Sequence, residues 1–76
     1  MKVRIVKLKD LENALHPNNI AEGFDRTYDV NKDYFEAPQL DRRFNIGQFS
    51  TSGVQEIIDE NTFKTYSSIY RWEVLE

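Results

Sequence analysis

Three oxygen-bearing side chains in the first half of the chain have the spacing of a calcium-binding loop. Asp29, Asn31 and Asp33 alternate along the sequence, and oxygen ligands at alternate positions suit a hard cation. The later positions of the loop do not fit, because Tyr34 stands where glycine is needed and Leu40 stands where a bidentate glutamate is needed. A polar turn between two strands explains these residues equally well, so we expect no metal ligand and no cofactor.

The chain contains one histidine, His16, which precedes a proline. Catalysis by a triad would need this imidazole beside a serine and a carboxylate. Nothing in the sequence selects such partners, and a histidine before proline is typical of a helix end. The glycines are isolated, so no glycine-rich phosphate loop is present. The sequence predicts no catalytic residue, and we expect that the protein is not an enzyme.

A basic pair stands beside an aromatic residue at Arg42, Arg43 and Phe44. Arginine binds phosphate through two parallel hydrogen bonds, and aromatic rings stack on bases. The interpretation that we favour is that Phe44 belongs to the core and the arginines pair with nearby acids such as Asp41. Arg42 and Arg43 remain candidate binding residues for a small anionic ligand.

The charge of the chain, −3 in total, is distributed unevenly. Residues 1–9 carry four basic residues and no acid, whereas residues 10–41 carry eight acids against two basic residues. An acidic domain binds nucleic acid poorly, because neutralisation of phosphates supplies most of that affinity, so we do not expect a nucleic-acid partner. The acidic segment is either a solvated surface or a docking surface for a basic partner, with Asp25, Asp29 and Asp33 as candidate contacts.

The size and composition of the chain indicate one small domain, residues 1–76. The absence of cysteine excludes disulfides and thiolate chemistry and favours a reducing compartment. The charged first ten residues exclude a secretory signal, and no apolar run approaches the roughly 20 residues that span a bilayer. We therefore expect a cytoplasmic protein without a membrane partner. Its ten aromatic residues can supply the burial that a short chain needs, within the domain or by self-association.

Apolar residues at alternate positions predict a mainly-β fold. Asp10 is the expected N-cap of a helix of one or two turns, which ends before Pro17. No interval is long enough for the crossover helix between parallel strands. We therefore expect a small barrel-like antiparallel sheet of five or six short strands, with one short helix after the first strand. The expected elements are strands at 2–8, 24–30, 42–49, 54–59, 62–65 and 69–75, turns at 31–33, 50–53 and 60–61, and a loop at 36–41.

The last strand alternates clearly, and its apolar residues share one face. Tyr70, Trp72 and Val74 lie on that face, and we expect it to be the core face.

The last third of the chain has a pattern of turn hydroxyls and strand apolar residues. It consists of Thr51, Ser52, Val54, Ile57, Thr62, Phe63, Thr65, Ser68 and Tyr70. This pattern resembles one in short uncharacterised proteins of bacteriophages and other mobile elements. Gly53 departs from it, since proline or another turn former is expected there. The resemblance implies a phage or mobile-element origin and a small β fold, and it implies no activity.

These observations predict a non-catalytic binding or interaction protein, a phage-encoded modulator of a host protein that binds a protein partner or associates with itself. One alternative is an oligomer that binds a small molecule or nucleotide through Arg42, Arg43 and aromatic residues. Another is a structural component of a phage particle. A nucleotide binder should have a concave pocket with arginine and an aromatic residue, a modulator a flat acidic patch, and a structural subunit a higher assembly.

Overall fold

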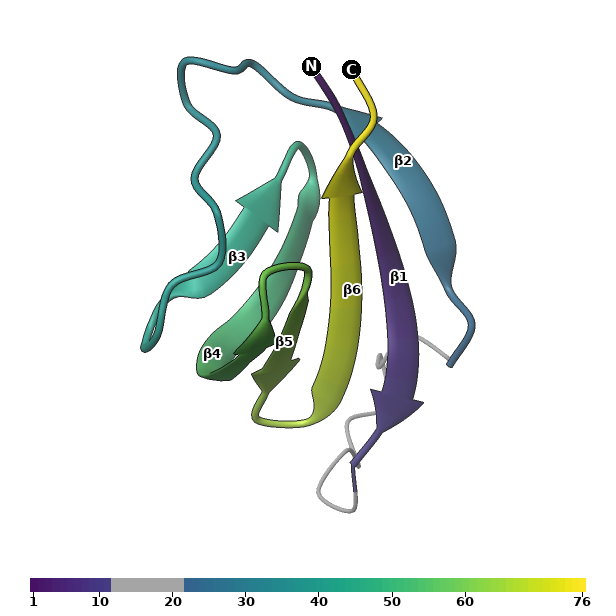
Figure 1. Cartoon of the computed structure of the whole chain (residues 1–76), viewed down its shortest axis with the longest axis vertical. Coiled ribbons are helices and arrows are strands. Elements are labelled where there is room, and N and C mark those ends of the chain that lie inside the picture. The colour runs from purple at the N-terminus through teal and green to yellow at the C-terminus, as the bar shows by residue number, and fades with distance from the viewer. Residues whose placement is uncertain (12–21) are drawn as a thin grey trace.

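The computed structural model describes residues 1–11 and 22–76, which contain six strands in one antiparallel sheet (Figure 1). The strands are β1 (Lys2–Asp10), β2 (Asp25–Asp29), β3 (Arg43–Ile46), β4 (Phe49–Asp59), β5 (Thr62–Thr65) and β6 (Ser68–Val74). Their order in the sheet is β2-β1-β6-β5-β4-β3. The sheet curls into a half-barrel with β2 and β3 at its edges. The prediction of a mainly-β antiparallel sheet of five or six strands is confirmed.

The predicted short helix falls on residues 12–21, outside the described residues, and residues 1–11 and 22–76 contain no helix. Asp10, the expected N-cap, is the last residue of β1, where its backbone continues the ladder opposite Ser68. The register between β1 and β6 shifts between Lys7 and Lys9. Val3, Ile5 and Lys7 are buried on one face of β1, and Val6 and Leu8 lie on the other, more exposed face. No helix in the described part of the chain is long and apolar enough to cross a membrane.

The predicted strand at 42–49 is present but shorter, as β3 at Arg43–Ile46, and the predicted turn at 50–53 is wrong. The chain reverses earlier, between Ile46 and Phe49, where Gly47 has a φ of 58°. Glycine adopts this left-handed conformation without steric cost, and a two-residue hairpin turn requires it. Residues 50–53 lie inside β4. Hydroxyl side chains bond to nearby backbone in strands as well as in turns, so they misplaced the turn.

The concave face of the half-barrel holds the core, and most of its side chains come from alternate strand positions. The buried apolar residues are Val3, Ile5, Phe44, Ile46, Phe49, Val54, Phe63 and Tyr70. Aromatic rings touch one another across this whole face, with centroid separations from 5.1 to 6.2 Å. At the gap between the edge strands, Phe24 and Tyr28 pack on Phe49 at 5.7 and 5.9 Å. Side chains rather than backbone hydrogen bonds therefore close the half-barrel on that side.

Candidate functional site: an arginine-lined cavity

A small cavity lies between edge strand β3 and the segment that joins β2 to β3. Its volume is about 210 Å³. The polar side chains that line it are Tyr34, Glu36, Gln39, Arg42, Arg43 and Asn45. The two arginines singled out from the sequence therefore share one concave site with an aromatic residue. This is the feature expected of the small-molecule or nucleotide binder.

Two aromatic residues that point into the core position the walls of this cavity. The rings of Phe35 and Phe44 meet edge to face at 6.2 Å, and Phe44 is only 2% exposed. Neighbouring residues of an extended chain point in opposite directions. Burial of Phe44 therefore turns Arg43 and Asn45 outward, toward the cavity, and Tyr34, in the turn before Phe35, lines it from the other side. The expectation that Phe44 belongs to the core is confirmed.

A β-bulge sets the direction of the arginine on β3. The register between β3 and β4 shifts between Arg43 and Asn45. The buried Thr51 hydroxyl accepts the backbone N–H of Phe44 at 3.1 Å and donates to the carbonyl of Ser52 at 2.7 Å. Bulges of this kind re-aim the neighbouring side chains and bend the strand. The Thr51 hydroxyl thus holds β3 in the conformation that points Arg43 toward the cavity.

Backbone hydrogen bonds to β4 fix the second arginine. The N–H of Asp41 donates to the carbonyl of Val54 at 2.9 Å, and the N–H of Val54 donates to the carbonyl of Arg42 at 2.9 Å. Asp41 has a φ of 64°, in the left-handed region that aspartate tolerates better than most residues. The chain turns sharply there, and the two bonds anchor Arg42 beside β3.

The cavity carries more positive than negative charge. Arg42 Nη1 lies 3.9 Å from Glu36 Oε2, and both side chains are exposed, so this ion pair is weak. Its partner is Glu36 and not the expected Asp41. Within residues 1–11 and 22–76, Arg43 forms no ion pair or side-chain hydrogen bond. Two arginines against one glutamate leave a charge of +1 at the cavity of a chain whose total is −3.

The chain matches no protein-family model, no curated protein and no solved structure. The function of the site therefore has to be inferred from its own geometry and charge.

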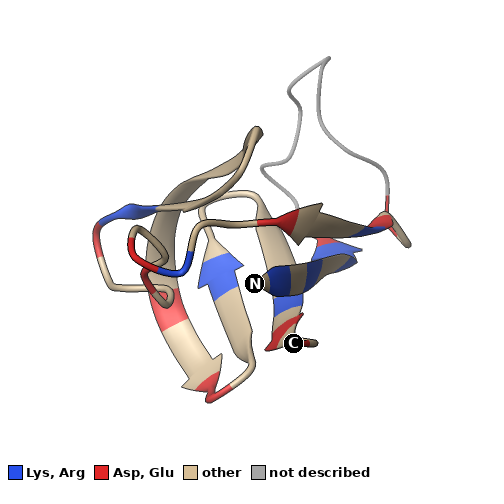
Figure 2. Ribbon diagram, turned by 90° about the horizontal axis from the view of Figure 1, so that it is seen from above, with Lys and Arg blue, Asp and Glu red and all other residues tan. Residues whose placement is uncertain are grey.

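The acidic candidates lie elsewhere, along β2 and the turn after it. Asp25 forms two hydrogen bonds with Arg4 of β1, from Nε to Oδ1 at 2.8 Å and from Nη2 to Oδ2 at 2.5 Å. Glu73 of β6 accepts a third from Arg4 at 3.1 Å. The Arg4 guanidinium holds the pKa of Asp25 below its usual range. Figure 2 shows basic bands of β1 beside acidic bands of β2 and β6, so the uneven charge of the sequence is partly neutralised within the sheet.

The residues with calcium-loop spacing lie in two different parts of the surface. Asn31 Oδ1 accepts the backbone N–H of Asp33 at 3.0 Å, as in a polar turn. Asp29 ends β2 opposite Lys2 of β1. The predicted turn at 31–33 is confirmed, since the N–H of Tyr34 also donates to the carbonyl of Asn31.

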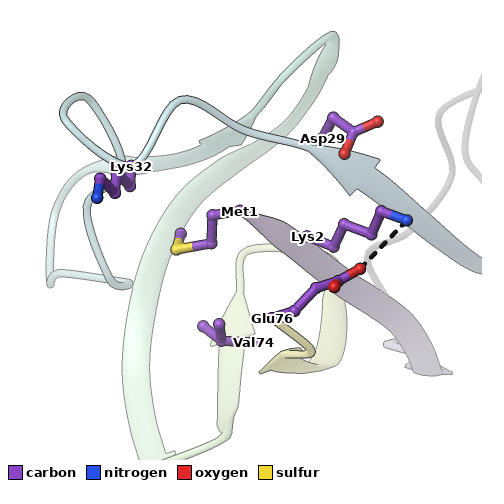
Figure 3. Close-up of a pocket in the computed structure, with 6 residues that line it drawn as sticks. All are labelled: Met1, Lys2, Asp29, Lys32, Val74 and Glu76. Carbon is purple, nitrogen blue, oxygen red and sulfur yellow. Dashed lines mark ion pairs between the residues drawn. The ribbon is translucent and has the colours of Figure 1, made fainter.

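A larger cavity of about 400 Å³ lies where the two chain ends meet (Figure 3). It is lined by Met1, Lys2, Asp29, Lys32, Val74 and Glu76. Figure 3 shows the ammonium of Lys2 directed at the carboxylate of Glu76, and the two groups lie 3.2 Å apart. The four charged side chains balance, so this cavity has no net preference for a cation or an anion. It is a weaker candidate site than the arginine-lined cavity.

One buried charge escaped the sequence analysis. Lys7 is fully buried in β1 and forms an ion pair with Asp10. Its register partner on β6 is Tyr70, whose hydroxyl lies among polar groups that include Ser68. The sequence does contain a pattern that indicates this burial, because Lys7 continues the alternation of the buried residues Val3 and Ile5.

Tyr70 should give this buried end of the half-barrel a measurable pH dependence. Burial raises the pKa of Tyr70 above its ordinary value of 10.0. The folded state therefore favours the neutral phenol, and this stabilisation is lost as the pH rises from 10 through the raised pKa. We therefore expect the urea midpoint of unfolding to decrease less steeply with rising pH, above about pH 10, in Tyr70→Phe than in the wild type.

Measurements near neutral pH are the control. There the loss of the Tyr70 hydroxyl should change the urea midpoint by a constant amount that does not depend on pH. Identical alkaline slopes for the two proteins would contradict the expectation.

Proposed function

We propose that the chain is a non-catalytic binding domain whose arginine-lined cavity takes a small molecule that carries a phosphate, with a nucleoside phosphate as the class that fits best. The observation that carries this proposal is the grouping of Arg42, Arg43 and Tyr34 around one cavity. A guanidinium group presents a planar fork of donors that matches two phosphate oxygens. The ring of Tyr34 is 83% exposed and offers a face on which a base can stack.

The size of the cavity limits what it can enclose. Sites for drug-sized ligands have volumes of roughly 300–1000 Å³, and this cavity has about 210 Å³. It suits a phosphate group and the atoms next to it, with the remainder of the ligand on the surface beside Tyr34. The amides of Gln39 and Asn45 can donate and accept hydrogen bonds that orient such a ligand.

Binding of adenosine monophosphate, inorganic phosphate and adenosine, followed by amide chemical shifts, tests the proposal. We expect the two phosphates to bind and adenosine to bind more weakly. Arg43→Gln should weaken binding of adenosine monophosphate at least about tenfold, because a hydrogen bond to a charged group contributes about 1.5–3 kcal/mol. Tyr34→Ala should weaken the binding of adenosine monophosphate and leave the binding of inorganic phosphate unchanged.

Arg71→Gln is the matched control, since Arg71 is an exposed arginine on β6 that does not line the cavity. It should bind like the wild type. Failure of both phosphates to bind the wild type, or equal loss in the Arg43 and Arg71 variants, would overturn the proposal.

The acidic segment at residues 10–41 is a weaker docking candidate than the sequence suggests. Asp25 is already held by Arg4, and Lys2 and Lys32 line the same cavity as Asp29. A phage origin, a role as modulator of a host protein, a structural role in a phage particle, self-association and a cytoplasmic location all stay predictions from the sequence.

A further inference from the structure

β4 is the longest strand, with 11 residues, and its two halves have different neighbours. β3 pairs only with the first half, from Phe49 to Gly53. β5 pairs with the second half, from Val54 to Asp59, on the other side (Figure 1). Within the described ranges 1–11 and 22–76, no strand lies against residues 55–59 on the side away from β5. This half of β4 therefore presents a free backbone edge in the interior of the strand order.

The beginning of this edge already accepts an extended segment of the chain itself. Leu40 forms a parallel bridge with Val54, and backbone hydrogen bonds join Val54 to Asp41 and Arg42. The segment then turns away at Asp41, where φ is 64°. The backbone on this side of β4 is thus accessible to an added strand, and the chain's own contact with it ends at Val54.

The free edge combines exposed apolar side chains with acidic ones. Ile57 is 42% exposed and Ile58 is 46% exposed, and Leu40 next to the edge is 56% exposed. Natural edges are usually short, charged or interrupted by proline. The outer edge of β2 follows this rule, because it is five residues long and three of them are charged. The free edge of β4 at residues 55–59 is equally short, with two charged residues and two register shifts, and it differs from β2 in its two exposed isoleucines.

The charge of the free edge selects the occupant. Glu56, Asp59 and the following Glu60 are acidic, and residues 54–61 contain no basic residue. Antiparallel pairing of this edge with a second copy would bring the acids of both copies together, which is unfavourable. On the β5 side, Lys64 lies opposite Glu56 and Arg71 of β6 acts on Asp59, so these two acids are partly balanced from that side. A strand that carries lysine or arginine between apolar residues complements the edge.

We propose that residues 55–59 of β4 dock an extended basic segment of a partner protein, which adds a strand to the sheet. Main-chain hydrogen bonds to the free edge hold the segment in register. Ile57 and Ile58 are consecutive and point to opposite faces of β4, so each contacts an apolar side chain on its own face of the segment. Glu56 pairs with a basic side chain of the segment, whereas Asp59 already accepts the backbone N–H of Asn61 at 2.8 Å and contributes only its charge. The interface is a single short strand, so binding is weak and depends on ionic strength. It is independent of the arginine-lined cavity.

A short capped peptide in which pairs of lysines alternate with pairs of valines serves as the probe, because it presents both residue types on each face of an extended strand. The same peptide with glutamate in place of lysine is its control. With the full chain, we expect the basic peptide to shift the amide resonances of residues 55–59 and to slow their hydrogen exchange. The acidic peptide should cause neither effect. Raising the salt concentration should weaken the binding of the basic peptide.

Variants at the two candidate edges locate the site. We expect binding of the basic peptide to weaken at least tenfold in Ile58→Lys and in Glu56→Lys. Binding should not change in Thr27→Lys on the β2 edge or in Arg43→Gln in the cavity. Urea midpoints close to that of the wild type exclude unfolding as the cause, and Glu56→Gln offers a milder change should either lysine variant unfold. The proposal is overturned if the wild type does not bind the basic peptide, if both peptides bind equally, if the shifts fall on β2 or β3, or if residues 55–59 instead join two copies of the chain.

Discussion

Phe44→Ala should lower the free energy of unfolding by about 3–5 kcal/mol, the largest effect that we expect from a single substitution. The side chain is almost fully buried, and its ring contacts those of Phe63 at 5.1 Å, Trp72 at 5.9 Å and Phe35 at 6.2 Å. Truncation loses the transfer energy of the ring and leaves a cavity among three aromatic neighbours. Native domains hold about 5–15 kcal/mol in total, and a chain this short belongs near the lower end.

Urea unfolding followed by circular dichroism measures this effect. Tyr34→Ala is the matched control, because its ring is on the surface and its loss should change the stability by no more than about 0.5 kcal/mol. Phe44→Leu should fall between the two. A wild-type midpoint for Phe44→Ala would mean that the aromatic cluster does not stabilise the half-barrel.

Trp72→Ala should cost about 3 kcal/mol, at the lower end of the range for a large aromatic residue, because the indole is only half-buried. Trp72 lies opposite Ile5 of β1, on the core face of the sheet. Its ring packs on those of Phe35 at 5.7 Å and Phe44 at 5.9 Å. The Trp72 ring thus packs the segment between β2 and β3, through Phe35, against the core of the sheet.

Because Trp72 is the single tryptophan, circular dichroism must replace fluorescence in this measurement. Val74→Ala is the control from the same strand face, and it should cost much less, since Val74 is half-exposed at the strand end. An unchanged midpoint for Trp72→Ala would identify the indole as a surface anchor for a partner, a role in which tryptophan is also enriched.

Local patterns were sufficient for much of the fold. The hairpin of β4 and β5 follows from two alternating runs around Glu60 and Asn61, and the structure confirms it. Of the predicted core face of β6, Tyr70 is buried, Trp72 is half-buried and Val74 is half-exposed, because the half-barrel stops covering the strand near its end. The predicted position of the turn between β3 and β4 was wrong, because Gly47 makes the turn and the hydroxyl residues after it do not.

The candidate site could be predicted only in part. Arg42 and Arg43 were named from their chemistry, but Tyr34 joins them through a long segment whose path depends on the burial of Phe35. The free edge of β4 depends on which strands lie beside it, and that is a property of the whole sheet order. Local sequence patterns carry no information on either.

The position of β1 in the strand order has a consequence for how the domain folds. β1 pairs with β6 along most of its length, with Val3 opposite Val74, and the backbone of Lys2 bonds to that of Leu75 and Glu76. β2 reaches the sheet only through β1. The first and last strands must therefore find each other before two of the six strands are held in place. Such distant pairings slow folding, since the loop entropy is lost before the contacts form. They also make the sheet one cooperative unit, in which fraying of β6 at its boundary with β1 releases β2 as well.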